Sequence, residues 1–592
     1  MRNRVEQAVD EESTFPTSSP TLTIVAAVND PSRRTFLTGV AAGAGAAGLA
    51  GILPAPVSAA TQATRRTAVA PVRRLIESDR QGFNRRWFAP NLQRVFVPTA
   101  VDQVEAIVEE ALTEHGRNVK VTSGRHCYLD FVYNDGTEAI IDMSALNQVG
   151  YDEEKEAFYV DAGCENWTAY RTLLNGYGRT LPAGSCYSVG AGGHITGGGY
   201  GLLSRLHGLT IDHLSAVDIV TWNARLSRAT MRHVSEASTD PRERDLFWAL
   251  RGAGGGNFGV IVRYYFADPP AAPQHAAIAT MAWDWADMTV ERFTVLLAEY
   301  ADLVTDLPRT DFMLLKLNHV SNGQLGMILQ MAAPTGMTRR EHERGAEKRA
   351  TSVRARFGAL ARGVPLRRPL GGHPGFMNSL PARENEVRLT YLEALQTLNG
   401  SGPNQFGAYK SAYMKKDFPA EQAEAIHRWL HVTPSGLAPE QMAQSLLQVD
   451  SYGGAVNEHS PRATAVPQRS SIMKLQYQTY WDNDSEPGQS GTSPYQQQSA
   501  AHLEWIRGMY GDVYSAYGGT PDPTQDPTGT VDGCYYNYPD LDLGSHRKGN
   551  AEKALWLYFL GNLRQGRRNL VDVKAHWDPE DYFHHAQSIP VK

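Results

Sequence analysis

A cysteine inside a glycine-rich stretch is the most reactive feature of the sequence. The stretch runs from Gly184 to Gly201, places Cys186 near its start and contains eight glycines in eighteen positions. Such a backbone can adopt positive φ and lets a ligand approach its N–H groups closely. His126 follows a glycine turn sixty residues upstream. A thiolate and a neutral imidazole in such turns could together hold one nucleotide-sized ligand.

A dinucleotide-binding Rossmann loop is one alternative for this stretch, because GAGGHITGGGYG contains a loose G-x-G-x-x-G pattern. A Rossmann loop leaves a strand, opens a helix and is followed about twenty positions later by an acidic residue. Gly197 to Gly199 would instead break such a helix at its first turn. The sequence therefore favours a wider glycine-rich phosphate cradle.

The composition describes a large globular chain whose partner is small and neutral. Its 592 residues suggest two or three domains, because one hydrophobic core does not grow to that size. Hydrophobic residues make up 42%, charged residues 20%, and the formal net charge is -6, so nothing favours a nucleic-acid partner. The four cysteines form no C-x-x-C pair, and no metal is expected.

Residues 1–59 are expected to be a disordered leader followed by an export signal. The twin arginine in Ser32 to Leu37 precedes an apolar run of small residues from Thr38 to Leu53, and Val57 to Ala59 offers a cleavage site. This pattern is typical of a twin-arginine signal, which exports folded proteins. A membrane anchor is the alternative, but prolines interrupt the chain directly after the run. We therefore expect a secreted or periplasmic bacterial enzyme without stable membrane association.

Alternating strands and helices characterise residues 75–268. Apolar residues at helical spacing predict a helix capped by Thr99 and ended by Gly116, and the strand Asn118 to Thr122 leads into the turn that carries His126. The remaining strands are expected at Arg94 to Ala100, Ala139 to Met143, Phe158 to Ala162, Val217 to Thr221 and Val260 to Phe266, and the remaining helices at Trp167 to Asn175 and Asp245 to Leu250.

Beyond Asp268-Pro269-Pro270 the pattern changes to a second, α+β domain over residues 269–500. Its predicted elements are the helices Val290 to Leu303 and Arg340 to Phe357 and the strands Phe312 to Leu317 and Met327 to Met331. Asp482 to Gln498 and Gly518 to Gly533 have the composition of surface loops. The segment 501–592 is expected to complete the active site, with a helix from Ala551 to Leu563 and a return to the first domain at Val571 to Ser588.

Six motifs in a fixed order carry a family resemblance: TSGRHCYLDF, IIDMSALN, GSCYSVGAGGHITGGGYGLLSRLHGLTIDHL, DLFWALRGAGGGNFGVI, YYNYPDLDLG and VDVKAHWDPEDYFHHAQSI. Together they resemble the berberine-bridge-enzyme-like flavoprotein oxidases of the vanillyl-alcohol-oxidase superfamily, over residues 75 to 590. The resemblance implies an α+β fold class: a two-part FAD-binding domain of vanillyl-alcohol-oxidase type, plus an α+β substrate domain with an antiparallel sheet.

The resemblance also implies that FAD is attached twice, through His126 to the flavin 8α carbon and through Cys186 to flavin C6. Taken singly, each residue could instead be a satisfied loop histidine or a buried inert cysteine. His194 is better interpreted as a hydrogen-bonding partner of a phosphate or of the backbone. The residues expected to contact the cofactor, mostly through backbone N–H groups, are Ser123, Gly124, Arg125, Cys127, Val189, Gly190, Gly192, Gly193, His194 and Gly198.

Arg125 is a departure from the family, which usually shows two glycines before the linking histidine. The arginine could reach the flavin pyrophosphate as a charge-assisted donor. It could also displace the loop and weaken the histidyl link.

The resemblance puts Tyr538, in Tyr535-x-Asn537-Tyr538, at the position of the family's catalytic base. Lys474 and Gln476 match positions that line the flavin in plant alcohol-oxidising members, as do Tyr128 and Tyr200. The ordinary alternatives are packing tyrosines and a surface lysine at a strand edge. Lys410 and Tyr413, in YKSAYM, are a further candidate pair for binding substrate.

Oxidation of an alcohol needs a base beside the hydroxyl. A free tyrosine has a pKa of about 10 and is about one part in a thousand ionised at neutral pH. A neighbouring Lys474 ammonium would favour the phenolate, so the ionisation of Tyr538 is expected below that of free tyrosine. Tyr535 and Tyr128 are further catalytic candidates. Val189 matches a position that gates oxygen in the family, and a valine there implies an oxidase.

These observations predict a secreted flavoprotein oxidase that oxidises an alcohol or carbohydrate hydroxyl by hydride transfer to FAD and passes the electrons to O2, giving H2O2. Oxidative tailoring or ring closure of a natural product is a second enzymatic hypothesis. A flavin-free protein that binds a glycan or an aromatic ligand is the alternative from a different class. The sequence leaves open the choice between sugar and aromatic alcohol, and the oligomeric state.

Overall fold

The computed structural model describes residues 74–367, 370, 386–402, 404–481 and 494–592. The leader and twin-arginine segment predicted at residues 1–59 lies outside this range. In the described part of the chain the strands form three sheets, of three, five and seven strands. None of the helices in that part is both long enough and apolar enough to span a bilayer.

The three-stranded sheet is parallel and carries the turn that leads to His126. Its strand order is β1 (Arg94–Phe96), β3 (Ala139–Asp142) and β2 (Val119–Thr122). Helix α1 (Val104–His115) buries the apolar positions that its spacing predicts, and Gly116 ends it with a φ of 54°. Thr99 was expected to cap this helix, but a short 3-10 turn with Ala100 as its N-cap precedes it.

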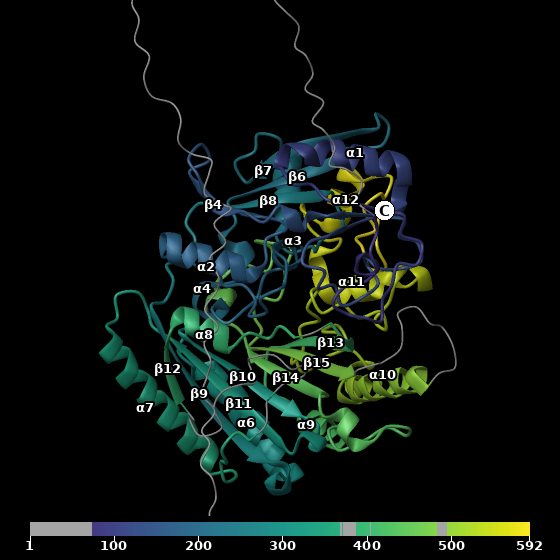
Figure 1. Ribbon diagram of the computed structural model, residues 1–592. Helices are drawn as coiled ribbons and strands as arrows, with labels where there is room; N and C mark the ends of the chain where they lie inside the picture. Colours follow the sequence, from purple (N-terminus) through teal and green to yellow (C-terminus); the bar gives the residue numbers. More distant parts are fainter. Residues whose placement is uncertain (1–73, 368–369, 371–385, 403, 482–493) are drawn as a thin grey trace, which may run out of the picture. The chain divides into compact units, whose positions relative to one another are not determined.

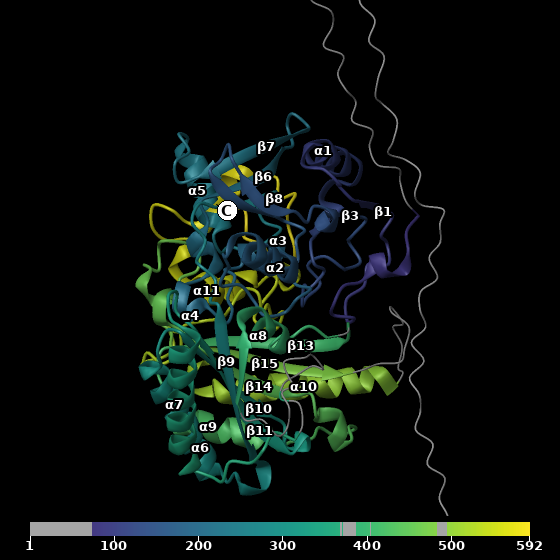
Figure 2. The ribbon, with the colours of Figure 1, turned by 60° about the vertical axis from the view of Figure 1, so that its left-hand side comes forward.

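The five-stranded sheet is antiparallel, in the order β4 (Val149–Asp152), β5 (Ala157–Asp161), β8 (Val260–Phe266), β6 (Ala216–Asn223) and β7 (Arg228–Ser235). Around it lie α2 (Asn166–Tyr177), α3 (Ala191–Thr196), α4 (Ser204–His207) and α5 (Pro241–Leu250). In Figures 1 and 2, α2 and α3 lie between this sheet and the seven-stranded sheet. The glycine-rich stretch therefore faces the middle of the described body.

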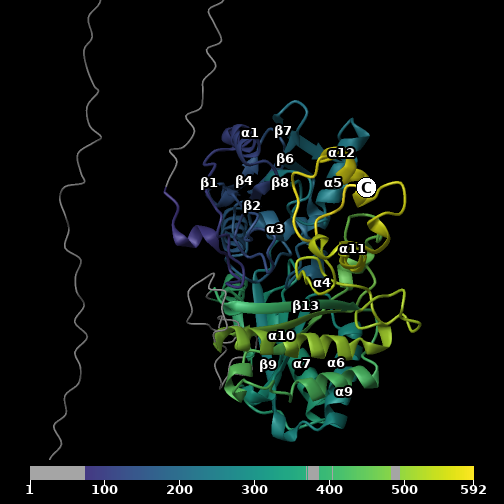
Figure 3. The same cartoon turned by 90° about the vertical axis from the view of Figure 1, so that its right-hand side faces the viewer.

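The seven-stranded sheet is antiparallel throughout. Its order is β12 (Glu386–Thr390), β9 (His275–Asp284), β11 (Gln324–Ala332), β10 (Asp311–Asn318), β14 (Leu446–Ser451), β15 (Met473–Trp481) and β13 (Phe406–Met414). The helices that accompany it are α6 (Val290–Asp306), α7 (Arg339–Gly358), α8 (Tyr391–Thr397), α9 (Ala420–Trp429) and α10 (Pro494–Val513). Helix α10 runs along β13 in Figure 3. Its start at Pro494 corrects the loop that was predicted to extend to Gln498; residues 482–493 of that loop lie outside the described part.

Alternation along β14 and β15 separates the two faces of this sheet. Lys474 pairs in register with Asp450, and Gln476 with Gln448, so these polar side chains share one face. Leu475 and Val449, also a register pair, point the other way. Because Gln448 and Asp450 line the large cavity described below, the polar face is the cavity face.

The chain ends in α11 (Ala551–Phe559), α12 (Leu570–Trp577) and a C-terminal strap, defined here as residues 578–589. Helix α12 packs against α5. The strap returns to the turn that follows α5, where the backbone N–H of Ile589 donates to Asn257 Oδ1 at 2.8 Å.

Candidate active site

A cavity of about 320 Å³ lies between the glycine-rich turns and the polar face of the seven-stranded sheet. Its walls are the 122–128 turn, the 184–193 stretch, β10, β14, the 535–539 segment and the strap. Both predicted linking residues, His126 and Cys186, line this one cavity. Segments that are far apart in sequence thus supply nucleophiles to a single space.

The two linking segments touch through their glycines. A Cβ added to Gly124 would lie 2.2 Å from the backbone nitrogen of Gly190, and one added to Gly190 would lie 2.1 Å from Ser123 Oγ. Neither distance is compatible with a side chain. The Ser123 hydroxyl donates to Ala162 O at 2.6 Å and so fixes the turn to the five-stranded sheet side. Glycine is required here for close approach of two backbones.

The imidazole of His126 is held by a hydrogen bond at one ring edge and by stacking on one ring face. Its Nε2 lies 2.7 Å from Ser188 Oγ, and its ring stacks on Phe83 with centroids 4.6 Å apart. Ser188 follows Cys186 by two residues. The hydrogen bond therefore connects the two segments that carry the nucleophiles.

The loop around Cys186 is anchored by side chains that the sequence analysis did not select. Asn166 Nδ2 donates to Cys186 O at 3.1 Å, and Tyr170 OH donates to Gly184 O at 2.7 Å. From the substrate side, Asn399 Oδ1 accepts the N–H of Tyr187 at 3.1 Å. Burial raises the pKa of the Cys186 thiol to about 11, and the Lys316 ammonium opposes this rise.

His194 anchors the same loop. Its Nε2 accepts the backbone N–H of Gly184 at 2.8 Å. Burial lowers its pKa to about 4, so the ring is neutral at physiological pH. The interpretation as a backbone partner fits this contact, although the ring also lines the cavity.

Arg125, the residue directly before His126, has a positive φ and pairs with a carboxylate. Its φ of 58° lies in the left-handed region, which a glycine adopts more readily than an arginine. The guanidinium forms an ion pair with Asp142 and donates to Ser78 O at 2.8 Å. The guanidinium charge is thus paired with a carboxylate of the chain, and a contact between Arg125 and the flavin pyrophosphate stays a prediction. The turn keeps His126 on the cavity wall.

Tyr538 belongs to a buried polar network on the opposite wall. Lys474 Nζ donates to Tyr538 OH at 3.3 Å and forms an ion pair with Asp450 at 2.7 Å. Lys474 is fully buried in β15, between β14 and β13, which excludes the alternative of a strand-edge surface lysine. Sequence analysis missed Asp450. The signal was available in the alternation of QVDS and MKLQ, which places Asp450 beside Lys474 once the strands are paired.

The direction of the tyrosine pKa contradicts the expected phenolate. Burial, followed by the negative charge of Asp450, raises the pKa of Tyr538 well above its ordinary value. The expectation failed because it included the lysine but neither the burial of Tyr538, which is the larger cause of the raised pKa, nor the Asp450 carboxylate that pairs with the lysine. In the protein as described, Tyr538 is a phenol at neutral pH.

The other predicted aromatic residues surround this network. Tyr128 stacks on Tyr409, with ring centroids 3.6 Å apart, and on Tyr538, with ring centroids 5.9 Å apart. Tyr535 lines the cavity and accepts from Asn537 Nδ2 at 3.1 Å. Tyr200 also lines it, but its hydroxyl donates to Ser451 O at 2.7 Å. Gln476 lies behind Tyr128, as its hydrogen bond to that hydroxyl indicates.

Lys410 and Tyr413 do not form a substrate-binding pair. They stand three residues apart in β13, so the two-residue period of a strand turns them to opposite faces. Lys410 forms ion pairs with Asp540 and Asp542 at 2.6 and 2.8 Å. Tyr413 is buried and packs against Tyr452 and Tyr535.

Gly198 was expected at the cofactor, but it serves a turn instead. Its φ is 122°, and a Cβ there would lie 3.4 Å from Val466. The other predicted cofactor contacts line the cavity: Ser123, Gly124, Arg125, His126, Cys127, Cys186, Val189, Gly190, Gly192, Gly193 and His194.

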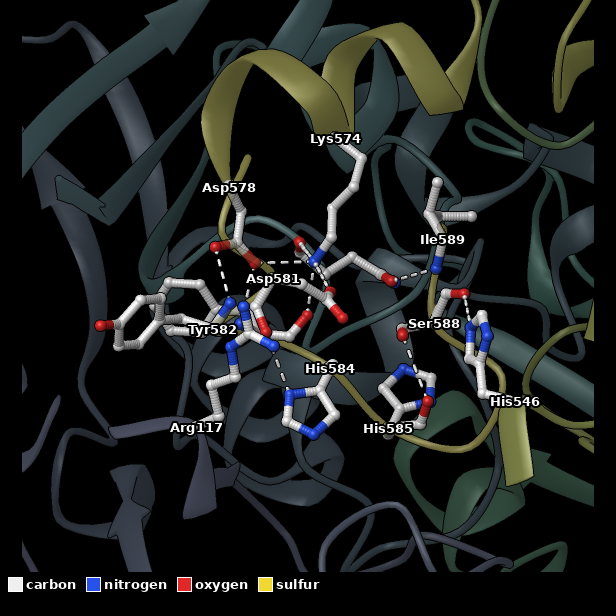
Figure 4. Close-up of polar contacts among 12 residues, drawn as sticks. Arg117, His546, Lys574, Asp578, Asp581, Tyr582, His584, His585, Ser588 and Ile589 are labelled. Atoms are coloured by element: carbon white, nitrogen blue, oxygen red, sulfur yellow. Dashed lines mark hydrogen bonds and ion pairs between the residues drawn. The ribbon is translucent and has the colours of Figure 1, made fainter. Parts of the chain in front are cut away.

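The C-terminal strap forms part of the cavity wall. Lys574 is fully buried, and its ammonium donates to Asp578 Oδ2 and Phe583 O, both at 2.7 Å. Figure 4 shows this ammonium among Asp578, Asp581 and the strap backbone. The anchored strap brings Phe583, His584 and His585 to the cavity wall. The ring of His585 stacks on that of Phe131, with centroids 3.9 Å apart.

The cavity fits an FAD molecule. A Cβ on Gly193 would meet no atom within 4 Å, although this residue lines the cavity, so its backbone faces open space. Backbone N–H groups from two glycine turns, two nucleophiles and an apolar end at Val119, Val121, Ile261 and Phe583 are combined in one space. Together these groups suit the binding of a phosphate-containing flavin nucleotide.

Comparisons with known proteins agree with this fit. A model described as an FAD binding domain matches residues 92–230, and one described as berberine and berberine like matches residues 534–590. The chain is 37% identical to hexose oxidase of Chondrus crispus, over 87% of this chain and 93% of that one. It is 32% identical to aclacinomycin-N/aclacinomycin-A oxidase of Streptomyces galilaeus, over 95% and 99%. A solved structure of a glycopeptide hexose oxidase complexed with teicoplanin superposes with a TM-score of 0.71 at 30% identity, covering 86% of this chain and 95% of that one.

The fold and the cavity define an FAD-dependent oxidoreductase. The chain belongs to the berberine-bridge-enzyme-like family of FAD-linked oxidases, as the sequence motifs implied. The hypothesis of a flavin-free binding protein is therefore wrong.

Proposed function

We propose that this protein oxidises a hydroxyl group of a carbohydrate and passes the electrons to O2, producing H2O2. The observation that carries the proposal is the Tyr538–Lys474–Asp450 network on the cavity wall that faces the linking residues. Gln448 and Asp450 line the same wall and offer hydrogen-bonding groups to a polyhydroxy substrate. Similarity to hexose oxidase of Chondrus crispus supports the same substrate class.

The network provides a route for the hydroxyl proton. FAD, when bound in the cavity, would supply the acceptor for the hydride from the substrate carbon. Lys474 can give a proton to Asp450, its partner at 2.7 Å, which leaves a neutral amine with a lone pair. Because Tyr538 is a phenol, it can take the substrate proton only as it passes its own proton to that amine. Asp450 is the acceptor at the end of this route, and Tyr538 is the group that contacts substrate.

We also propose that both His126 and Cys186 form covalent bonds to the flavin, since both nucleophiles line the cavity that accepts it. Acid-precipitated protein should then stay yellow. His126→Ala and Cys186→Ala should each retain covalent flavin, and only the double variant should release it. Complete release from Cys186→Ala alone would show that no histidyl bond forms.

Oxidative tailoring of a natural product is the second candidate. It is favoured by the relative from Streptomyces galilaeus, an aclacinomycin oxidase, which matches nearly the whole chain. The aromatic group formed by Tyr128, Tyr409 and Tyr538 could stack on an aromatic aglycone as well as on a sugar ring.

Peroxide release by the purified protein separates the two candidates. The panel should contain free hexoses, oligosaccharides, aryl alcohols and glycosylated aromatic polyketides. We expect the highest kcat/KM with a free or oligomeric sugar. Turnover of only the glycosylated polyketides would establish the second candidate, and slow reoxidation by O2 with fast reoxidation by quinone dyes would identify a dehydrogenase.

Export by the twin-arginine pathway remains part of the proposal. Its support is the Arg33-Arg34 pair and the apolar run that follows it. Replacing both arginines with lysine should keep the protein in the cytoplasm of a bacterial host, whereas the unchanged chain should reach the periplasm or the medium. Equal export of both forms would reject this pathway.

A further inference from the structure

The hydrogen bond between His126 and Ser188 does not end at Ser188. Ser188 Oγ lies 3.2 Å from Ser401 Oγ, and Ser401 Oγ also accepts the backbone N–H of Ser188 at 3.2 Å. Ser401 itself is fixed by its N–H, which donates to Asn399 Oδ1 at 3.0 Å. A chain of polar atoms thus runs from the imidazole across to the segment that precedes β13.

We infer that Ser188 and Ser401 are positioning residues for covalent attachment of flavin to His126, because they hold the tautomer in which Nε2 carries the proton. In this arrangement Nε2–H donates to Ser188 Oγ, and Ser188 donates its own hydrogen to Ser401 Oγ. The lone pair of the imidazole is then on Nδ1. The inference rests on the histidyl bond proposed above and adds two residues that do not themselves bond to the flavin.

The bond-forming step balances with this proton placement. Nδ1 bonds to the methyl carbon at flavin position 8, one C–H bond of that methyl group breaks, and its electron pair stays on the ring system. The C–H proton and the Nε2 proton complete a flavin that is reduced by two electrons. Dioxygen, the acceptor in the proposed reaction, then removes two electrons and two protons as H2O2.

Two contacts restrict the ring in a way that a free imidazole would not experience. Phe83 stacks on one face at 4.6 Å, and Ser188 binds the Nε2 edge at 2.7 Å. A ring flip would place a carbon next to the Ser188 hydroxyl and lose the hydrogen bond. The ring orientation in which Nε2 faces Ser188 is therefore the one that these two contacts stabilise.

The test uses the full chain carrying Cys186→Ala, so that the histidyl bond is the remaining covalent link. Ser188→Ala and Ser401→Ala are added separately, and the purified proteins are sampled over time. The measured quantity is the share of bound flavin that stays with the acid-precipitated protein, with the His126 peptide identified by mass. We expect Ser188→Ala to slow attachment by about three- to tenfold, as for the loss of one hydrogen bond between neutral groups, and Ser401→Ala to slow it less.

Controls make the outcomes distinct. Ser188→Thr keeps the hydroxyl and should restore the rate of attachment. Ser445→Ala removes a buried hydroxyl that hydrogen-bonds Thr479 Oγ1 at 2.7 Å away from the cavity, and should leave attachment unchanged. Equal attachment rates with and without Ser188→Ala would overturn the inference. So would a fall in total flavin that matches the fall in covalent flavin, since Ser188 would then act on binding. Complete release from Cys186→Ala alone would instead refute the histidyl bond on which the inference rests.

Discussion

The two long walls of the cavity use different chemistry. The glycine wall, residues 122–128 and 184–193, presents backbone N–H groups and two nucleophiles, and its side chains lie in turns held by hydrogen bonds to backbone atoms. The sheet wall, formed by β10, β14 and the 535–539 segment, presents charged and polar side chains that interact with one another and with Lys474 of β15. One wall depends on close approach of backbones, and the other depends on the balance of buried charges.

This difference predicts how each wall responds to change. Substitutions on the glycine wall should alter flavin content and attachment while leaving the pH dependence of the reaction in place. Substitutions on the sheet wall should alter rate and pH dependence while leaving the flavin attached. The predictions below test this division, beginning with the largest expected effect.

Tyr538→Phe should give the largest loss on the sheet wall. It removes the hydroxyl that hydrogen-bonds Lys474 and that we propose as the group contacting substrate, and a missing acid–base group costs about two to four orders of magnitude in rate. Stopped-flow measurement of flavin reduction under anaerobic conditions checks the rate, and acid precipitation checks that the flavin stays attached. Reduction at a rate close to that of the unchanged protein would eliminate Tyr538 and turn attention to Tyr535.

On the glycine wall, Gly124→Ala and Gly193→Ala form a matched pair. The first adds a Cβ 2.2 Å from the Gly190 nitrogen and should destabilise the fold together with flavin binding. The second adds a Cβ that meets no protein atom within 4 Å, so the fold should remain and the flavin content should fall several-fold. Thermal unfolding and flavin absorbance measure the two effects. A Gly193→Ala protein with full flavin content would show that this part of the cavity is not used.

The sequence predicted the glycine wall better than the sheet wall, for a physical reason. Gly124, Gly190, His126 and Cys186 act within short segments, so their types and order already indicate the ligand. Asp450 and Lys474 stand 24 positions apart and meet only because β14 and β15 pair in one register. A shift of one residue would turn one of them to the other face.

The same limit explains an error and an omission at single residues. Lys410 was grouped with Tyr413 by proximity in sequence, whereas the strand separates their faces. Arg125 was judged without Asp142, which binds its guanidinium from the end of β3. Local helices were predicted well, as for α1 and α6, because their apolar spacing is complete within the segment.

Opposite shifts in pH dependence should follow from the two charges beside Tyr538. After burial, Asp450 is a cause of the raised pKa of Tyr538, so Asp450→Asn should lower the pKa that governs flavin reduction. Lys474→Met leaves Asp450 unpaired beside the phenol and should move that pKa upward. Asp450→Asn should also reduce the maximal rate, because the proton loses its final acceptor.

Because the pKa of Tyr538 lies above 10, anaerobic reduction is followed from pH 5 up to the highest pH at which the protein stays folded, and each shift is measured as a displacement of the rising part of the rate profile. Unshifted profiles in both variants would contradict the buried charge balance. A shift in the same direction in both variants would show that packing around Tyr538, and not charge, sets the pH dependence of flavin reduction.

Val189→Leu should be an exception to the division between the walls, because Val189 belongs to the glycine wall but its substitution should act on the oxygen reaction alone. Val189 lines the cavity three residues after Cys186, and one added methylene reduces the space there. Reoxidation by O2 should slow several-fold, while anaerobic reduction by substrate should keep its rate. Val189→Ala is the matched control and should reoxidise at least as fast as the unchanged protein. Equal reoxidation rates in all three proteins would remove Val189 as a gate.

Lys316→Met should have the smallest effect. It tests whether a charge on the sheet wall influences the Cys186 thiol on the glycine wall. Lys316 belongs to the sheet wall, where it hydrogen-bonds Gln448, yet its charge opposes the burial that raises the pKa of the Cys186 thiol to about 11. Without this cation the thiol pKa should rise further, the thiolate fraction should fall, and the cysteinyl bond should form a few times more slowly. Burial lowers the pKa of Lys316 itself to about 8, so the difference in attachment rate between Lys316→Met and its parent should narrow above that pH, where the ammonium loses its proton.

The measurement follows covalent flavin over time in a His126→Ala background, where the cysteinyl bond is the one observed. Lys316→Arg keeps the charge and should keep the rate; if it slows attachment as much as Lys316→Met, the sheet wall acts on Cys186 through packing and the charge argument fails.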